Sequence, residues 1–130
     1  MSIERINPGN LPVPHGFSHA VAAEGRLVFL AGQTGVAPDG SIVAGGVVAQ
    51  FEQALAHLLS ALEAAGGHRE QLASLTIYIV DMDDYQAHTG EIGGVWRRLV
   101  GPDYPAMAGV GVSRLWDADA VVEIQGLAVI

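Results

Sequence analysis

The 130-residue sequence contains no cysteine and no lysine. Without cysteine the chain can form no disulfide, no thiol nucleophile and no thiolate metal site. Without lysine it can form no Schiff base and has no P-loop lysine. All six cationic residues are arginines, and 14 acidic residues give a formal net charge of −8. This balance predicts that the protein has no nucleic-acid partner, because nucleic-acid binding needs a cationic surface.

Long apolar runs are also missing, although half of the residues are hydrophobic. No stretch approaches the roughly 20 apolar residues that a membrane-spanning helix needs, and the first residues show no signal-peptide pattern. We therefore expect a cytoplasmic protein with no membrane partner. The length predicts one domain over residues 1–130, and so much apolar surface on a small domain favours an oligomer.

Two helices are predicted from hydrophobic periodicity. Apolar residues at spacings of three and four predict an amphipathic helix over residues 47–65, ended by a left-handed turn at Gly66-Gly67. A second helix is expected after a cap at Asp83 or Asp84. It contains three glycines, which cost helix propensity, so we expect them to pack closely against another backbone. These glycines are Gly90, Gly93 and Gly94.

Strands are predicted on either side of these helices. Residues 17–23 and 26–31 are expected to form a hairpin, and a short strand is expected near Ile42. The later strands are predicted over residues 75–80, 107–115 and 120–130. Two helices can cover only one face of the resulting sheet. The strand over 75–80 has apolar residues on both faces, so we expect copies of the chain to cover the second face.

Glu123 is the candidate catalytic acid, because it lies in a strand that is otherwise almost wholly apolar. A carboxyl in apolar surroundings can act as a general acid or base near neutral pH. Alternatively, Glu123 and Gln125 share a solvated face of an edge strand. Gly32 follows a strand and could let a ligand approach the backbone, or could simply form a tight turn. No HExxH motif or cluster of metal-binding residues occurs, so we expect no metal and no cofactor.

Six short segments of the sequence stand in a characteristic order. They are Gly16-Phe17-Ser18-His19-Ala20-Val21, Leu30-Ala31-Gly32-Gln33, Leu62-Glu63-Ala64-Ala65-Gly66, Val80-Asp81-Met82-Asp83-Asp84-Tyr85, Tyr104-Pro105-Ala106-Met107 and Val121-Val122-Glu123-Ile124. Together they resemble the Rid family, also called YjgF or L-PSP-like proteins. The resemblance covers nearly the whole chain, with a few extra residues in the loop before Pro105.

The resemblance implies a chorismate-mutase-like α+β fold, in which two helices pack on one face of a mixed sheet. It also implies a homotrimer that binds small molecules in clefts between subunits, and the hydrolysis of enamines or imines without a cofactor. In the family's scheme an arginine holds the substrate carboxylate, a glutamate positions water and a backbone group near a glycine orients the substrate. The glutamate corresponds to Glu123 and the glycine to Gly32.

Two substrate-binding positions depart from the family's pattern. The arginine corresponds to Met107, and an aromatic hydroxyl near the N-terminus corresponds to Phe17, which has none. A charge-assisted hydrogen bond contributes roughly 1.5–3 kcal/mol, so a carboxylated imine would bind more weakly. Arg114 lies about 23 Å further along the same predicted strand. The sequence leaves open whether a neighbouring subunit supplies Arg97, Arg98 or Arg114.

Two hypotheses follow. The first is a RidA-like hydrolase of the enamine/imine deaminase type, in which Glu123 activates water. Phe17, Gly32 and Met107 would then contact an altered, non-carboxylate substrate. The alternative is a non-catalytic trimer that binds a metabolite or a partner protein in the same clefts. A ribonuclease activity is not favoured, because the net charge is −8 and lysine is absent.

Overall fold

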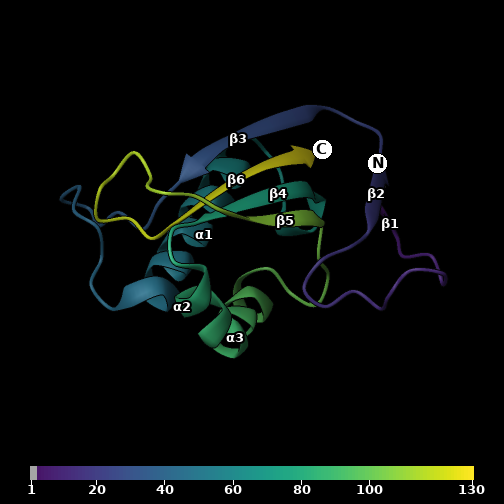
Figure 1. Cartoon of the computed structure of the whole chain (residues 1–130). Helices are drawn as coiled ribbons and strands as arrows, with labels where there is room; N and C mark the ends of the chain where they lie inside the picture. The colour runs from purple at the N-terminus through teal and green to yellow at the C-terminus, as the bar shows by residue number, and fades with distance from the viewer. Residues whose placement is uncertain (1–2) are drawn as a thin grey trace.

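The computed structural model describes residues 3–130 and contains a four-stranded mixed sheet and a small two-stranded ribbon (Figure 1). Three α-helices and a short 3₁₀ turn, η1, complete this part of the chain. The strands are β1 (Ile3–Ile6), β2 (Ala20–Ala23), β3 (Leu27–Gln33), β4 (Leu72–Ile79), β5 (Ala106–Gly111) and β6 (Val122–Val129). The helical elements are α1 (Gly46–Ala64), η1 (Arg69–Gln71), α2 (Met82–Ala87) and α3 (Thr89–Leu99).

The helix α1 confirms the helix predicted over residues 47–65. Its apolar stripe is buried against the sheet, and Phe51, Leu55 and Leu58 are each at most 1% exposed. The helix ends where Gly66 takes a φ of 90° and its N–H bonds to the carbonyl of Glu63. A residue with a side chain rarely adopts this backbone conformation, so glycine suits the end of the helix.

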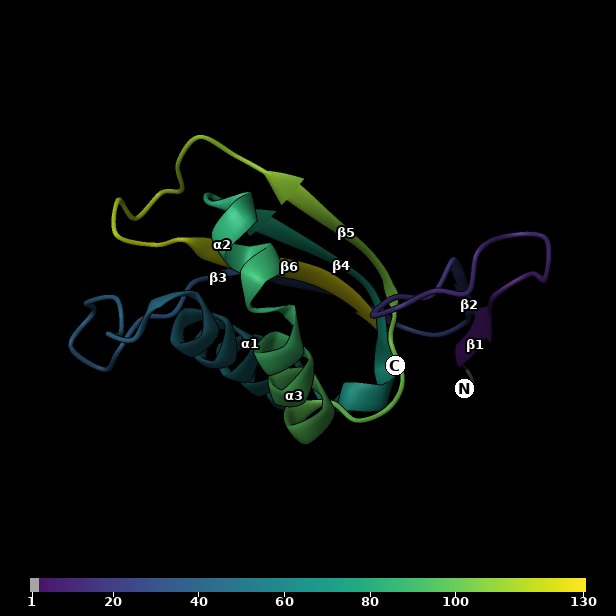
Figure 2. The same ribbon diagram turned by 60° about the horizontal axis from the view of Figure 1, so that its bottom comes forward.

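The main sheet has the strand order β3-β6-β4-β5. The strands β4 and β5 are parallel, whereas β6 runs antiparallel to both β3 and β4. The helices α1 and α3 pack on one face of this sheet (Figure 2). On β4, Leu75, Ile77 and Ile79 are buried beneath them. The predicted α+β architecture, with helices on one face only, is therefore confirmed.

The predicted hairpin between residues 17–23 and 26–31 is wrong. The strand β2 pairs with β1, while β3 pairs with β6 at the far edge of the main sheet. Backbone hydrogen bonds between Arg26 and Ile130 direct the chain into β3 beside the end of β6. Near Ile42, the expected strand is only an isolated bridge to Val36. Pairing over a long sequence separation decides these elements, and a local turn pattern does not reveal it.

The second predicted helix is divided into α2 and α3 at His88. The predicted cap at Asp83 or Asp84 is wrong: the N-terminal cap is Asp81, whose carboxylate accepts a hydrogen bond from the N–H of Asp84 at 3.0 Å. The expected close packing of its glycines is also wrong. A side chain at Gly90 would meet nothing within 4 Å, and Gly93 has only the Arg97 side chain nearby.

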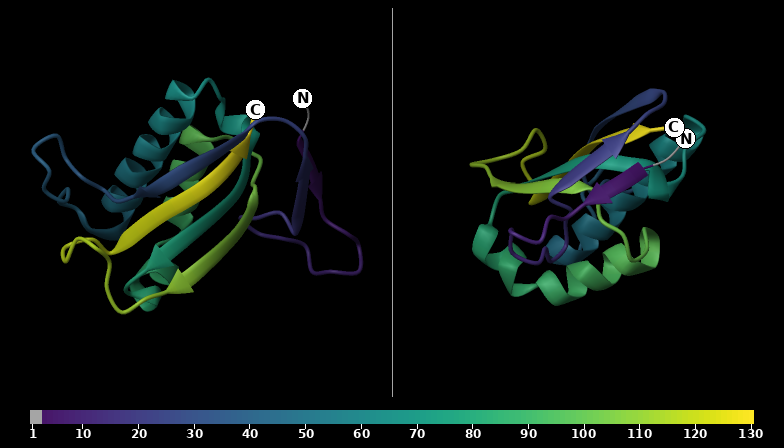
Figure 3. Two further views of the ribbon diagram at one scale, coloured as in Figure 1. Left: turned by 90° about the horizontal axis from the view of Figure 1, so that it is seen from above. Right: turned by 90° about the vertical axis from the view of Figure 1, so that its right-hand side faces the viewer.

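Among the helices of residues 3–130, none covers the sheet face opposite α1 and α3 (Figure 3). It carries polar groups on β4 and apolar groups on the outer strands. Phe29 is 79% exposed, Leu27 is 55% exposed and Val110 is 39% exposed. We call this surface the open face. Within residues 3–130, every helix is too short or too polar to cross a membrane.

Candidate functional site

Gly32 and Glu123 lie against each other on the two paired strands β3 and β6. The ladder between these strands is irregular between Leu30 and Gln33. A Cβ atom on Gly32 would overlap Oε2 of Glu123, so only glycine leaves room for the carboxylate beside this backbone. Gly32 does not have a positive φ and lies within β3. The simple tight turn considered for Gly32 is therefore wrong.

Glu123 is half-buried on the open face, between the fully buried Val122 and Ile124. It pairs with Tyr78 of β4, whose hydroxyl donates a 2.9 Å hydrogen bond to Oε1 of Gln125. Glu123 and Gln125 thus share one face, as the alternative interpretation proposed. The strand β6 is not an edge strand, however, because it lies between β3 and β4.

Phe17 and Met107 lie together at the start of β5. The segment around Ser18 runs beside this strand: the Ser18 N–H donates to Pro105 O at 2.9 Å, and its hydroxyl donates to Tyr104 O at 2.6 Å. Met107 pairs with Leu75 and packs against the core, so its side chain lies on the helix side of the sheet. These contacts fix the N-terminal segment beside Met107.

A cavity of about 430 Å³ opens between β5 and the helices α2 and α3. Its wall is largely aromatic and aliphatic. The rings of Phe51 and Tyr85 meet edge to face with their centroids 6.3 Å apart, and the ring of Trp96 stacks on that of Tyr104 with a centroid distance of 5.1 Å. The lining residues are His15, Gly16, Phe17, Phe51, Ile77, Ile79, Tyr85, Thr89, Ile92, Gly93, Trp96, Arg97, Tyr104, Met107, Ala108 and Gly109.

The four predicted site residues therefore form two separate pairs. Met107 and Phe17 line the cavity, whereas Gly32 and Glu123 do not. Met107 pairs with Leu75, and Glu123 pairs with Tyr78 three residues further along β4. With strands about 4.8 Å apart and residues about 3.3 Å apart, these two Cα atoms are more than about 13 Å apart. Their side chains also project from opposite faces of the sheet.

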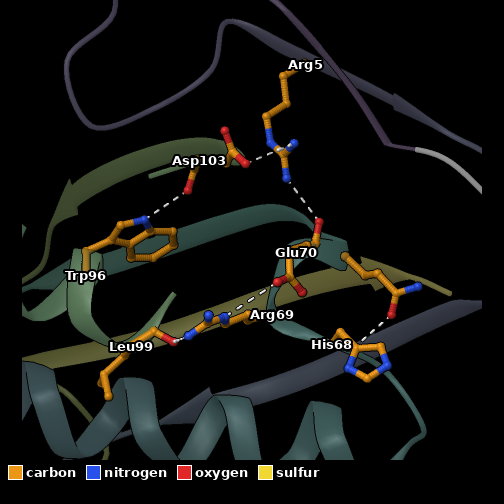
Figure 4. A network of polar contacts seen from close by, with 8 residues as sticks. Arg5, His68, Arg69, Glu70, Trp96, Leu99 and Asp103 are labelled. Carbon is orange, nitrogen blue, oxygen red and sulfur yellow. Dashed lines mark hydrogen bonds and ion pairs between the residues drawn. The ribbon is translucent and has the colours of Figure 1, made fainter. Parts of the chain in front are cut away.

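A polar network fixes the loop that enters the cavity wall (Figure 4). The Trp96 ring N–H donates to the Asp103 carbonyl at 3.0 Å, and the Asp103 carboxylate lies 3.6 Å from Arg5. Arg5 also donates to Glu70 O at 3.0 Å. The strand β1, η1 and the loop before Tyr104 are thereby joined, although 98 residues separate Arg5 from Asp103. The Arg5 Nε is buried without a partner in residues 3–130.

Tyr85 is the cavity residue whose acidity the fold changes most. Burial raises the pKa of its phenol to about 12. The folded chain therefore holds this proton more tightly than the unfolded chain, whose tyrosine has a pKa of about 10. The associated stability is present below pH 10 and is lost as the pH rises to about 12. At neutral pH the hydroxyl is a neutral group in the cavity wall.

The raised pKa of Tyr85 predicts that alkaline solution destabilises the wild type more than the Tyr85→Phe variant. From pH 10 to pH 12, the free energy of unfolding of the wild type should fall by about 2 kcal/mol more than that of the variant. Urea unfolding at a series of pH values measures both quantities. Parallel pH profiles of the two proteins would show that the phenol is not desolvated in solution.

The aromatic wall of the cavity was not expected from the sequence. Tyr85 and Tyr104 occur in the segments that resemble the Rid family, but no role is implied for either of them. Tyr85 and Trp96 are eleven residues apart, which is a helical spacing, but this spacing does not distinguish a core residue from a cavity residue. Among residues 3–130 there is no group of three or more His, Cys, Asp or Glu side chains that could hold a metal ion.

Comparison with known proteins gives consistent similarities along the whole chain. The family profile described as "Endoribonuclease L-PSP" matches residues 9–130. A RutC family protein of Pyrococcus horikoshii is 36% identical over 127 residues, which cover 96% of each chain. A goat (Capra hircus) protein named 2-iminobutanoate/2-iminopropanoate deaminase is 32% identical, covering 95% of this chain and 88% of its own. The crystal structure of YyfB from Yersinia pestis, described as a Rid family protein of unknown function, has a TM-score of 0.89 and 31% identity over both full chains.

Proposed function

The L-PSP profile, which is that of the Rid family, matches residues 9–130, so the chain belongs to this family, and we propose that it hydrolyses an imine or enamine at a site completed between subunits. The separation of the two residue pairs carries this proposal. The pair Gly32–Glu123 lies on the open face, and the pair Phe17–Met107 lines a cavity behind β5. An open face with exposed Phe29 and Leu27 needs a cover, and a neighbouring copy can bring the two half-sites together.

In the proposed reaction, Glu123 acts on water and not on the substrate directly. Its carboxylate accepts a proton as water adds to the carbon of the C=N bond, which gives a carbinolamine. The same carboxyl returns this proton to the nitrogen, which completes the carbinolamine. The carboxylate then takes the proton of the carbinolamine hydroxyl and passes it to the nitrogen, so that ammonia leaves and a carbonyl remains. One water is consumed and one ammonia is released, so the step needs neither a metal nor an oxidant. Gly32 leaves the backbone beside this carboxylate accessible to the substrate.

The other half-site indicates an altered substrate. At Met107 the family's arginine is replaced by an uncharged side chain, and at Phe17 a ring hydroxyl is absent. A carboxylate held at this position would lose its charge-assisted hydrogen bonds. We therefore propose a substrate that places an apolar group, and no carboxylate, against Met107 and Phe17. A trimer that binds such a molecule without hydrolysing it is the alternative function.

The test combines assembly with turnover. Light scattering should give a mass of about 40 kDa, which corresponds to three chains of 13.5 kDa. Ammonia release should be faster with imines generated by oxidation of arylalkyl amines or aromatic amino acids than with 2-aminoacrylate or 2-iminobutanoate. Phe29→Asp should release monomers and abolish turnover together, because each monomer holds only separate half-sites. Ala61→Asp, on the exposed face of α1, is the control for added charge.

Three outcomes would contradict parts of this proposal. If Phe29→Asp is monomeric and fully active, the site does not depend on a neighbouring subunit. Rapid turnover of 2-iminobutanoate would show that Met107 does not exclude small carboxylated imines. Saturable binding with no ammonia release from any imine would favour the non-catalytic alternative.

A further inference from the structure

We propose that Arg97 is the anion-binding residue of the cavity, so that the ligand is an acid with an aromatic or branched apolar body. This inference rests on the proposed function in one respect, namely that the cavity is the ligand site. It also changes the expectation, drawn from the sequence, that the substrate has no carboxylate. The ligand has an acidic group, which binds at the wall formed by α3 and not at Met107 on β5.

Among residues 3–130, Arg97 is the only permanently charged residue that lines the cavity. The other polar side chains in the wall are those of His15, Tyr85, Thr89 and Tyr104. Arg97 therefore adds one positive charge to a largely apolar wall, even though the whole chain carries a net charge of −8. Because Arg97 is exposed to solvent, a strong attraction needs direct contact between its guanidinium and the bound anion.

Arg97 is also the one arginine whose guanidinium has no protein partner among residues 3–130. Arg5 and Arg26 donate to the carbonyls of Glu70 and Ala65, and Arg69 donates to the carbonyl of Leu99. Arg98 binds the Glu52 carboxylate at 2.7 Å, and Arg114 donates to its own loop. The donors of Arg97 thus remain free for a ligand, and a guanidinium can bind a carboxylate with two hydrogen bonds at once.

The glycines of α3 place this guanidinium along the cavity wall. Nη1 of Arg97 lies 3.4 Å from the position that a Cβ on Gly93 would occupy, and Gly93 itself lines the cavity. Nη2 lies 4.0 Å from the corresponding position on Gly94. The side chain therefore folds back over the preceding helical turn, although the residue remains exposed to solvent. A larger residue at position 93 would crowd it, which gives the otherwise unfavourable helix glycine a function.

The rest of the wall indicates the body of the ligand. The cavity of about 430 Å³ lies within the range of about 300–1,000 Å³ found for sites of drug-sized molecules. Phe17, Trp96 and Tyr104 offer ring surfaces, and Ile77 and Ile92 offer aliphatic ones. A three-carbon acid could not contact Arg97 and fill this apolar volume as well. The combination favours an aryl-substituted or branched carboxylic acid.

Binding of stable probes tests this inference without any turnover. We choose 3-phenylpropanoate, its neutral analogue 3-phenylpropanamide and acetate, measured by titration calorimetry on the assembled protein. The wild type should prefer the propanoate to the amide and bind acetate weakly. Arg97→Met should weaken propanoate binding by about 10- to 100-fold and leave amide binding unchanged. Arg97→Lys should be intermediate, because it keeps the charge but not the paired donors.

Arg98→Met is the matched control, since it makes the same charge change one residue further on and outside the cavity lining. It should bind the propanoate like the wild type. Equal propanoate binding by Arg97→Met and the wild type would overturn the inference, and so would equal weakening by Arg98→Met. Because no imine is present, this result is separate from the proposed function. Turnover that needs Glu123 but not Arg97 would refute the inference alone.

Discussion

Glu123→Gln is expected to lower the kcat for imine hydrolysis by about 10²- to 10⁴-fold, which is the usual contribution of a general base. Glutamine has nearly the same shape, so the close contact with Gly32 is retained while the proton acceptor is lost. The KM should change little, because the cavity that binds the body of the substrate does not include this carboxylate. A loss confined to kcat identifies a group that acts in the chemical step.

Tyr78→Phe provides the control on the same face of the sheet. It removes the hydroxyl that binds Gln125 but leaves the Glu123 carboxylate in place. We expect its kcat to stay within a few-fold of the wild type. The assay compares ammonia release by both variants on a freshly generated aromatic imine, after light scattering has shown that their assembly is unchanged. An unchanged kcat in Glu123→Gln would remove this residue from the mechanism.

The ends of helix α1 could be predicted to within one residue, because one side of the helix is buried and the pattern that shows this lies within the helix itself. Each apolar position recurs with the helical period, and Gly66 ends the pattern. Strand pairing, in contrast, could not be predicted from short sequence patterns. The chain places β2 against β1 and sends β3 to the opposite edge, although Glu24-Gly25 has the composition of a hairpin turn. Such pairings depend on contacts between distant residues, to which periodicity is insensitive.

For the candidate site, the sequence predicts residues but not their arrangement. Glu123 and Met107 were assigned to one reaction, yet strand alternation places them on opposite faces of the sheet. That conclusion needs the register between β4, β5 and β6, which the sequence does not provide. Arg97 was considered as a contribution from a neighbouring subunit. Its presence in the same cavity as Met107 depends on how α3 packs below β5.

Met107→Arg is expected to raise kcat/KM for 2-iminobutanoate by about 10- to 100-fold, because it restores paired hydrogen bonds to a carboxylate. Met107 is half-buried, and the apolar stem of an arginine can replace its contacts while the guanidinium enters the cavity. Hydrolysis of aromatic imines should fall at the same time. The new cation competes with Arg97 for the acid group and occupies apolar volume.

Met107→Leu is the volume control and should keep the substrate preference of the wild type, since it changes shape without adding charge. The double variant Met107→Arg/Arg97→Met separates the two cations. It should retain the gain on 2-iminobutanoate and weaken the binding of 3-phenylpropanoate, because the proposed partner at position 97 is absent and the new side chain at position 107 occupies volume that the phenyl ring would fill. If Met107→Arg folds and assembles normally but gains no activity on 2-iminobutanoate, then the missing arginine does not set the substrate preference. The substrate preference would then be set by the aromatic wall around Trp96 and Tyr104. Small substrates would bind weakly there because they leave most of the cavity unfilled.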